Sequence, residues 1–384
     1  MMRFCLNPIY QLFQNSDENF TGLIIGLIDG ENTYGYQLVE TPEIKVDYSL
    51  PIVPLLNSNI ESEEGKYKDW ILEHARQVSR LLPGGISIIG FFTVSEDKEF
   101  LNTKLVSPAV KEVNNLLAAL RNDEYSKSDQ LIHLHLQIYS EERICKLIDI
   151  KNFKSNVMKI EIAELPILRT VRAKVRFYAE KELTENPLND IKDLITNWTK
   201  LAQTFTVKTN GESCEIFSKS LKYGNVRDIT KAVRLSGLLE CFALCQENSK
   251  ITPRVAEWIK EDLISSMRIR YDLLSEKTSW PNKDLSKKIA EPFEYTLPRR
   301  IYFNLKNEIP VTDMICSDES IADSQERLKY LFGTDPGNGE ELEIIAQMNP
   351  RDIPIVQPTQ RKANMGIIIV AIPIIIAILI AYFI

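Results

Sequence analysis

The chain has 384 residues, of which 44% are hydrophobic and 26% are charged. This length predicts two or three domains, and the composition excludes a mainly disordered chain, a collagen and a polytopic membrane protein. Asp and Glu outnumber Lys and Arg by 53 to 46, which gives a formal net charge of -7. Nucleic-acid binding is therefore not expected, because affinity for phosphates requires clustered positive charge.

Residues 1–150 have the pattern of an α+β domain. Apolar runs bounded by turn residues predict strands, and apolar residues at helical spacing predict helices. An Asp29-Gly30 turn joins the first two strands as a hairpin, and Pro83-Gly84-Gly85 ends the first helix. The expected elements are strands at 22–28, 34–39, 86–94, 131–139 and 145–150, and helices at 67–82 and 106–120.

Residues 155–332 predict a second α+β domain, and residues 333–365 predict a flexible linker because they are rich in Gly, Pro, Gln and Asn. Pro253 suits the first turn of a long amphipathic helix in this domain. The expected elements are strands at 157–164, 168–179, 232–244 and 299–305, and helices at 190–204, 253–274 and 320–331.

The end of the chain is its most apolar segment. Residues 366–384 carry no charge, and as a helix they would span about 28 Å, close to the hydrocarbon thickness of a bilayer. Because all backbone polar groups must be paired within lipid, one transmembrane helix is expected. The predicted anchor consists of Gly366, Ile367, Ile368, Ile369, Val370, Ala371, Ile372, Pro373, Ile374, Ile375, Ile376, Ala377, Ile378, Leu379, Ile380, Ala381, Tyr382, Phe383 and Ile384.

Flanking charge predicts the orientation of this anchor. Arg361 and Lys362 precede it, and the N-terminus has no apolar run of signal-peptide length. A single-pass, tail-anchored protein with its body in the cytosol is therefore expected. The short tail with little basic charge favours the thinner endoplasmic reticulum membrane, with the mitochondrial outer membrane as the alternative.

His133-Leu134-His135 is the one candidate metal pair in the sequence. In a strand both imidazoles share a face, so a membrane-tethered zinc hydrolase is an alternative function. The sequence offers no distinctive third ligand or general base, so two histidines of a structural strand are the favoured interpretation. No cofactor is expected. His74, on the helix with Arg76 and Arg80, has no nucleophile elbow to act with and is interpreted as a surface residue of that helix.

The run EHARQVSRLLPGG at 73–85, followed by ISIIGFF, resembles the odorant-response-abnormal protein 4 family of tail-anchored membrane proteins. The runs GLIIG at 22–26, LPRRIY at 297–302 and CSDES at 316–320 resemble family segments in the same order. The resemblance assigns one block to fold determination or to partner binding, without separating the two. This block is Glu73, His74, Arg76, Gln77, Arg80, Pro83, Gly84 and Gly85.

The resemblance implies an MPN-like N-terminal domain without metal, hence a pseudoenzyme. The run GFFTVSED at 90–97 lacks the two histidines of an active MPN site. It also implies a non-catalytic adaptor at the endoplasmic reticulum that retains the cysteine protease specific for the ubiquitin-fold modifier. Membrane receptors, odorant receptors among them, would be clients in maturation or trafficking. The alternative is a receptor-escort factor that binds client helices through residues 366–384.

Overall fold

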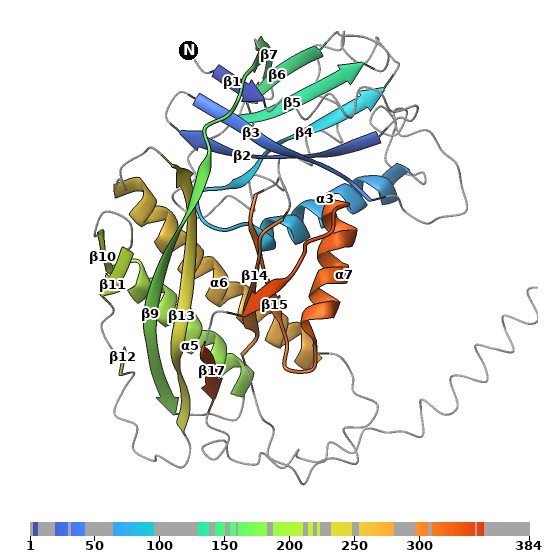
Figure 1. The fold of residues 1–384 in the computed structure, drawn as a ribbon. Helices are drawn as coiled ribbons and strands as arrows, with labels where there is room; N and C mark the ends of the chain where they lie inside the picture. Colours follow the sequence, from blue (N-terminus) through green and yellow to red (C-terminus); the bar gives the residue numbers. More distant parts are fainter. Residues whose placement is uncertain are drawn as a thin grey trace, which may run out of the picture.

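The structure is a computed structural model with a mixed α+β fold, as the sequence predicts. It describes residues 3–6, 20–29, 32–42, 64–95, 130–137, 143–149, 154–158, 160–182, 187–209, 214–217, 221–222, 232–247, 253–279, 297–305, 309–341 and 344–348. Within these residues the chain forms three sheets and four helices, which Figure 1 shows from one side.

The first sheet has eight strands in the order β7-β6-β5-β4-β2-β3-β1-β8. β2 and β3 form the antiparallel hairpin expected from the Asp-Gly turn. β4 runs antiparallel to β2 and parallel to β5. The strands are β1 Arg3–Leu6, β2 Phe20–Asp29, β3 Asn32–Glu40, β4 Ser87–Ser95, β5 Gln130–Gln137, β6 Arg143–Asp149, β7 Lys154–Met158 and β8 Ile160–Ile162.

Strand β2 of this sheet is buried on both faces. Successive side chains of a strand point to opposite faces, so its residues enter two different core clusters. Leu23 and Ile25 of β2 pack with α3 (Glu64–Leu81), whereas Ile24 packs with Phe92 and Leu134 on the other face. The near-continuous apolar sequence of β2 is explained by this burial on two sides.

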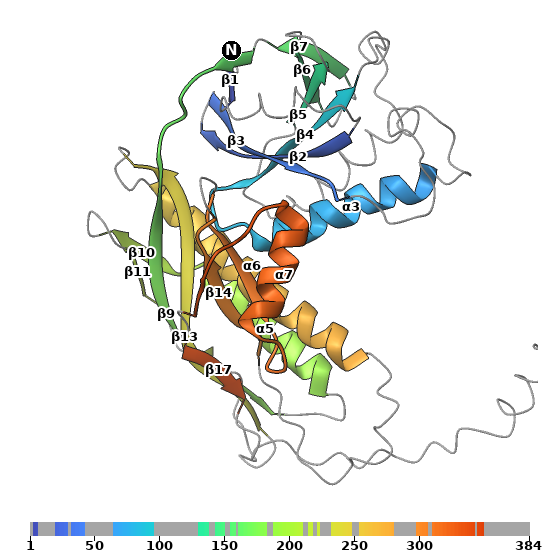
Figure 2. The same cartoon turned by 45° about the vertical axis from the view of Figure 1, so that its right-hand side comes forward.

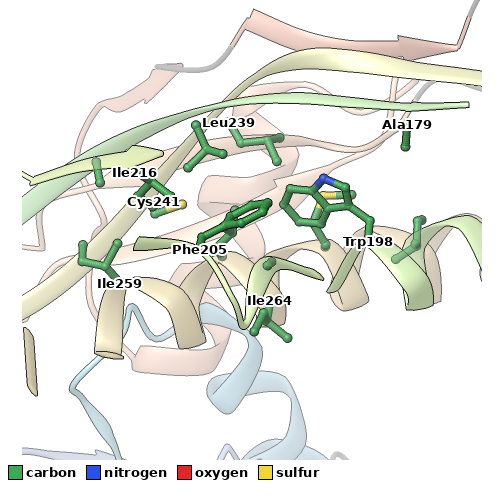
Figure 3. Close-up of a cluster of buried hydrophobic side chains, with 14 of the residues drawn as sticks. Ala179, Trp198, Phe205, Ile216, Leu239, Cys241, Ile259 and Ile264 are labelled. Atoms are coloured by element: carbon green, nitrogen blue, oxygen red, sulfur yellow. The ribbon is translucent and has the colours of Figure 1, made fainter. Parts of the chain in front are cut away.

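The second sheet is built on β9 (Leu168–Glu182) and β13 (Ala232–Gln246), which pair antiparallel along their whole length. α5 (Pro187–Ala202) and α6 (Pro253–Ser279) cover one of its faces. There Trp198 meets Phe205 edge to face at 5.9 Å between ring centroids (Figure 3). The remaining strands are β10 Thr206–Thr209, β11 Cys214–Phe217, β12 Leu221–Lys222 and β17 Ile344–Met348.

The third sheet joins the two larger ones. Its strands are β14 Arg299–Phe303, β15 Val311–Ile315 and β16 Gly339–Glu341, and α7 (Ile321–Phe332) packs beside it. Ser320 and Asp323 form a capping box at the start of α7, and Gly333 ends it in the left-handed conformation. In both views α3 lies between the first sheet and α7 (Figure 2). Side chains of α3, α7, β14 and β15 share one core cluster with the first sheet.

Several strands lie outside the residue ranges in which the sequence pattern expects them. β7 ends at residue 158 and β8 at residue 162, and both belong to the first sheet, beyond the expected limit of 150. Residues 339–341 and 344–348, expected within the flexible linker of 333–365, are β16 and β17. β16 reads GEE, and the short apolar run IIAQM of β17 stands within a segment rich in Gly, Pro, Gln and Asn, which obscured both strands.

Two expected helices lie outside the described residues, namely the one at 106–120 and the transmembrane segment at 366–384. None of the four helices within the described part of the chain is long and apolar enough to cross a membrane.

Candidate functional site

The block singled out from the sequence starts on α3, where its side chains divide between core and surface. His74 is 1% exposed, which corrects its interpretation as a surface residue. Its Nε2 lies 3.0 Å from the Leu331 carbonyl of α7, and its Nδ1 lies 3.2 Å from the Thr41 hydroxyl. Because a carbonyl only accepts, Nε2 carries the proton and Nδ1 accepts from Thr41. Burial lowers the pKa of His74 to about 4, so the imidazole is neutral and links α3 to α7.

Glu73, Arg76 and Gln77 form the surface part of the block. Glu73 binds the Arg76 guanidinium in an ion pair, and its Oε1 accepts from Gln77 Nε2 at 3.0 Å. The Glu73 and Arg76 side chains are 37% and 43% exposed. Such a pair one helical turn apart adds only about 0.3–0.5 kcal/mol to helix stability. We call these three residues the α3 surface triad.

Pro83-Gly84-Gly85 carries α3 into β4 and also touches the second sheet. The Gly84 N–H donates to the Phe242 carbonyl at 3.0 Å, and the Leu244 N–H donates to the Gly84 carbonyl at 2.9 Å. A Cβ on Gly84 would overlap the Trp258 carbonyl oxygen of α6. Gly85 has a φ of 84°, in the left-handed region that favours glycine. The two glycines thus permit a backbone contact between the α3–β4 turn, β13 and α6.

We expect Gly84→Ala to destabilise the protein by about 1–3 kcal/mol, because the added methyl group meets rigid backbone on two elements. The measurement is urea unfolding of the detergent-solubilised chain, followed by tryptophan fluorescence. Ser79→Ala, on the last turns of the same helix, is the matched control and should remain within about 0.5 kcal/mol of the parent. Equal stability of the two variants would contradict the close contact.

A buried ion pair lies beside Gly84 and covers the same edge of β13. Arg300 of β14 forms a two-pronged contact with Asp262 of α6, at 2.6 and 2.7 Å, and both side chains are under 5% exposed. Asp262 also accepts from the Phe242 N–H at 2.8 Å, and Arg300 donates to the Glu240 carbonyl at 3.3 Å. Side chains therefore satisfy backbone groups that a further strand would otherwise pair.

This ion pair was missed by the sequence reasoning, although a local signal exists. Asp262 interrupts the apolar face of α6 next to Ile259 and Leu263, and it is buried with them. Arg300 lies in a strand whose four last residues are all buried. A charge at a core position of each of two elements is a signature of a buried pair, since such charges are almost always paired.

The other residues of the block lie around this joint. Arg80 reaches Glu276 of α6 at 3.5 Å, and the Pro83 carbonyl accepts from the Ile86 N–H at 3.4 Å. The structure thus brings His74, Arg80, Gly84 and Gly85 into contacts between elements, places Pro83 in the α3–β4 turn, and leaves the α3 surface triad bonded within itself.

The candidate metal pair lies elsewhere, in β5. His133 and His135 alternate with Leu134 and so lie on one face of that strand, between β4 and β6. Their side chains are outside the described residues. Among the side chains that the structure describes, no three His, Cys, Asp or Glu residues gather as metal ligands. In the α3 block the two ring nitrogens of the buried His74 imidazole are engaged by the Thr41 hydroxyl and the Leu331 carbonyl.

Comparison with known proteins gives matches along most of the chain. The family model described as ODR4-like, Odorant response abnormal 4-like, matches residues 22–220 and 217–338. Protein odr-4 homolog from Xenopus tropicalis is 22% identical over 367 residues, covering 82% of this chain and 79% of that protein. Protein odr-4 homolog from Homo sapiens is 23% identical over 363 residues, covering 81% and 77%.

Two further similarities are more limited. Odorant response abnormal protein 4 from Caenorhabditis elegans is 29% identical over 96 residues, covering 24% of this chain and 20% of that protein. The solution structure of a Desulfitobacterium hafniense protein covers 42% of this chain and 94% of its own, at 15% identity and a TM-score of 0.22. That score is too low to assign a fold.

Proposed function

This chain belongs to the odorant response abnormal 4-like family, and on that premise we propose that it is a non-catalytic, tail-anchored adaptor. Residues 366–384 hold it in the endoplasmic reticulum membrane with its body in the cytosol. The body retains a soluble partner, the cysteine protease specific for the ubiquitin-fold modifier. Membrane receptors, such as odorant receptors, are clients whose maturation or trafficking it supports.

The division of the α3 block is the observation that supports an adaptor most directly. The buried residues of the block join α3 to α7, β13 and α6. The α3 surface triad contributes little to that joint, because its hydrogen bonds run between its own members. A polar, preorganised and half-exposed triad suits the polar rim of a protein interface. We therefore propose that it faces the partner.

Tethering gives such an adaptor a function without chemistry of its own. A partner retained near a membrane encounters membrane-bound substrates at a higher effective concentration than it would free in the cytosol. The names of the relatives refer to an odorant response, which supports receptors as the clients. The eight-stranded first sheet with α3 on one face is the part that we propose to be MPN-like.

The adaptor proposal is tested by affinity purification from detergent extracts, comparing the full chain with a chain that ends at Met365. We expect the protease to co-purify with both and to move from the membrane fraction to the cytosol with the shorter chain. Retention of no soluble partner by either chain would overturn the adaptor. Zinc in stoichiometric amount in the purified body would instead favour the hydrolase built on His133 and His135.

A charge swap separates partner binding from helix stability. We expect Glu73→Arg and Arg76→Glu each to weaken protease retention about tenfold, because each reversal sets a like charge against the partner, with unfolding changed by less than about 1 kcal/mol. The double swap restores the ion pair in reverse. If the partner reads the pattern of charge, binding stays weak in the double swap while helix stability recovers. Recovery of binding together with stability would assign the triad to the fold alone.

A further inference from the structure

Two short strands just after α7 close the described part of the chain. We call β16 (Gly339–Glu341) and β17 (Ile344–Met348) the strap. β16 pairs with β14 of the third sheet, and β17 pairs with Leu235–Leu238 of β13 in the second sheet. The strap therefore occupies one edge in each of two sheets. Its register on β13 shifts between Ser236 and Leu238, which interrupts the ladder.

Two ion pairs at the surface link β16 of the strap to neighbouring strands. Glu340 lies 3.9 Å from Arg172 and Glu341 lies 3.5 Å from Arg299, with the two glutamate side chains 59% and 32% exposed. Exposed pairs of this kind contribute little to stability. Both arginines keep other partners if the strap leaves: Arg172 lies over the Tyr302 ring at 4.8 Å, and Arg299 donates to the Glu319 carbonyl at 3.3 Å. Release would therefore strand neither charge.

The rest of the same edge of β13 is closed in a different way. From Glu240 to Leu244 it is covered by the buried Arg300–Asp262 pair and by Gly84, inside the joint of the three sheets. The strap covers only the outer end of β13, at Leu235–Leu238. The joint is closed by a buried ion pair, whereas the ladder to β17 is short and interrupted by a register shift, so we expect this end to open at a lower free-energy cost than the joint.

We propose that the strap is releasable and that its release lengthens the tether between the body and the membrane anchor. With the strap in place, 17 residues (349–365) separate it from the anchor, a maximum reach of about 58 Å. Release at Gly339 makes the tether 27 residues long, with a maximum reach of about 92 Å. The membrane consequence rests on the proposed anchor, whereas release itself does not.

Release is tested by hydrogen exchange on the full chain in detergent micelles. We expect amides of Ile344–Met348 to exchange at least about tenfold faster than those of Cys241–Cys245. Charge reversal of Glu340→Lys with Glu341→Lys should accelerate them about fivefold further. Glu326→Lys, an exposed charge reversal on α7, is the control and should leave them unchanged. Ser236→Cys with Gln347→Cys, at directly paired positions, should slow them once oxidised and release them on reduction.

The proposal would be overturned if the strap amides exchange as slowly as those of Cys241–Cys245 and if neither the charge reversal nor the disulfide changes their exchange rates. That result would make β17 an integral strand of the second sheet.

Reach is measured separately, in liposomes with a labelled headgroup. A fluorophore at Lys200 of α5 reports energy transfer to the surface, and we expect less transfer in the charge-reversed chain than in the oxidised one. Equal transfer in these two chains would overturn the lengthening. A chain that does not float with liposomes would overturn the anchor instead, and the exchange experiment would still decide on the strap.

Discussion

Asp262→Ala is expected to cost about 3–5 kcal/mol of unfolding free energy, because it leaves the Arg300 guanidinium buried without its carboxylate. It also removes the acceptor of the Phe242 N–H. A loss of this size is a large share of the 5–15 kcal/mol that stabilises a typical domain, so a molten or aggregated protein is the expected outcome at 37 °C. Urea unfolding at 25 °C, followed by tryptophan fluorescence, measures it.

A matched substitution and a double change make this result specific. Glu257→Ala removes an exposed carboxylate of the same helix and should change stability by less than about 0.5 kcal/mol. Asp262→Leu combined with Arg300→Met removes both charges and should recover most of the loss, because an uncompensated charge no longer remains. A single variant as stable as the Glu257→Ala control would mean that the pair does not support the joint.

Helix α3 shows most clearly which features of the fold can be predicted from the sequence. Its apolar spacing and the Pro-Gly-Gly stop predict the helix and its end, because both are local signals. The contact of Gly84 with β13 is not local, since about 160 residues of chain separate the two. A glycine in the sequence indicates that another backbone segment can approach closely, but it does not identify that segment. The same holds for His74, whose partner on α7 is 257 residues away.

The strap is the part of the fold for which the sequence prediction is wrong. Its two strands are short and stand among residues of linker composition, and they form by pairing with the open edges of β13 and β14. Local propensity for strand is weak evidence where tertiary pairing decides. Sequence reasoning therefore finds the elements with strong periodicity, finds the α3 block by resemblance, and misses those contacts that only the assembled sheets create.

The pH dependence of stability tests the second large effect, the buried neutral His74. Burial lowers its pKa from the ordinary 6.5 to about 4 in the folded protein. Between these values the unfolded chain binds more protons than the folded one, so the free energy of unfolding falls as the pH drops. Its contribution is complete above pH 6.5, decreases down to pH 4 and is constant below. The loss reaches about 3 kcal/mol.

His74→Gln isolates this contribution from the carboxylates, which also titrate in acid. Its Nε2 amide still donates to the Leu331 carbonyl, but it takes up no proton in this range. The difference in unfolding free energy between the parent and His74→Gln should therefore be constant above pH 6.5 and shift by about 3 kcal/mol down to pH 4. A difference independent of pH would mean that His74 keeps an ordinary pKa and is hydrated. In that case the link from α3 to α7 would have to come from the Trp70–Tyr330 ring contact and the shared core cluster alone.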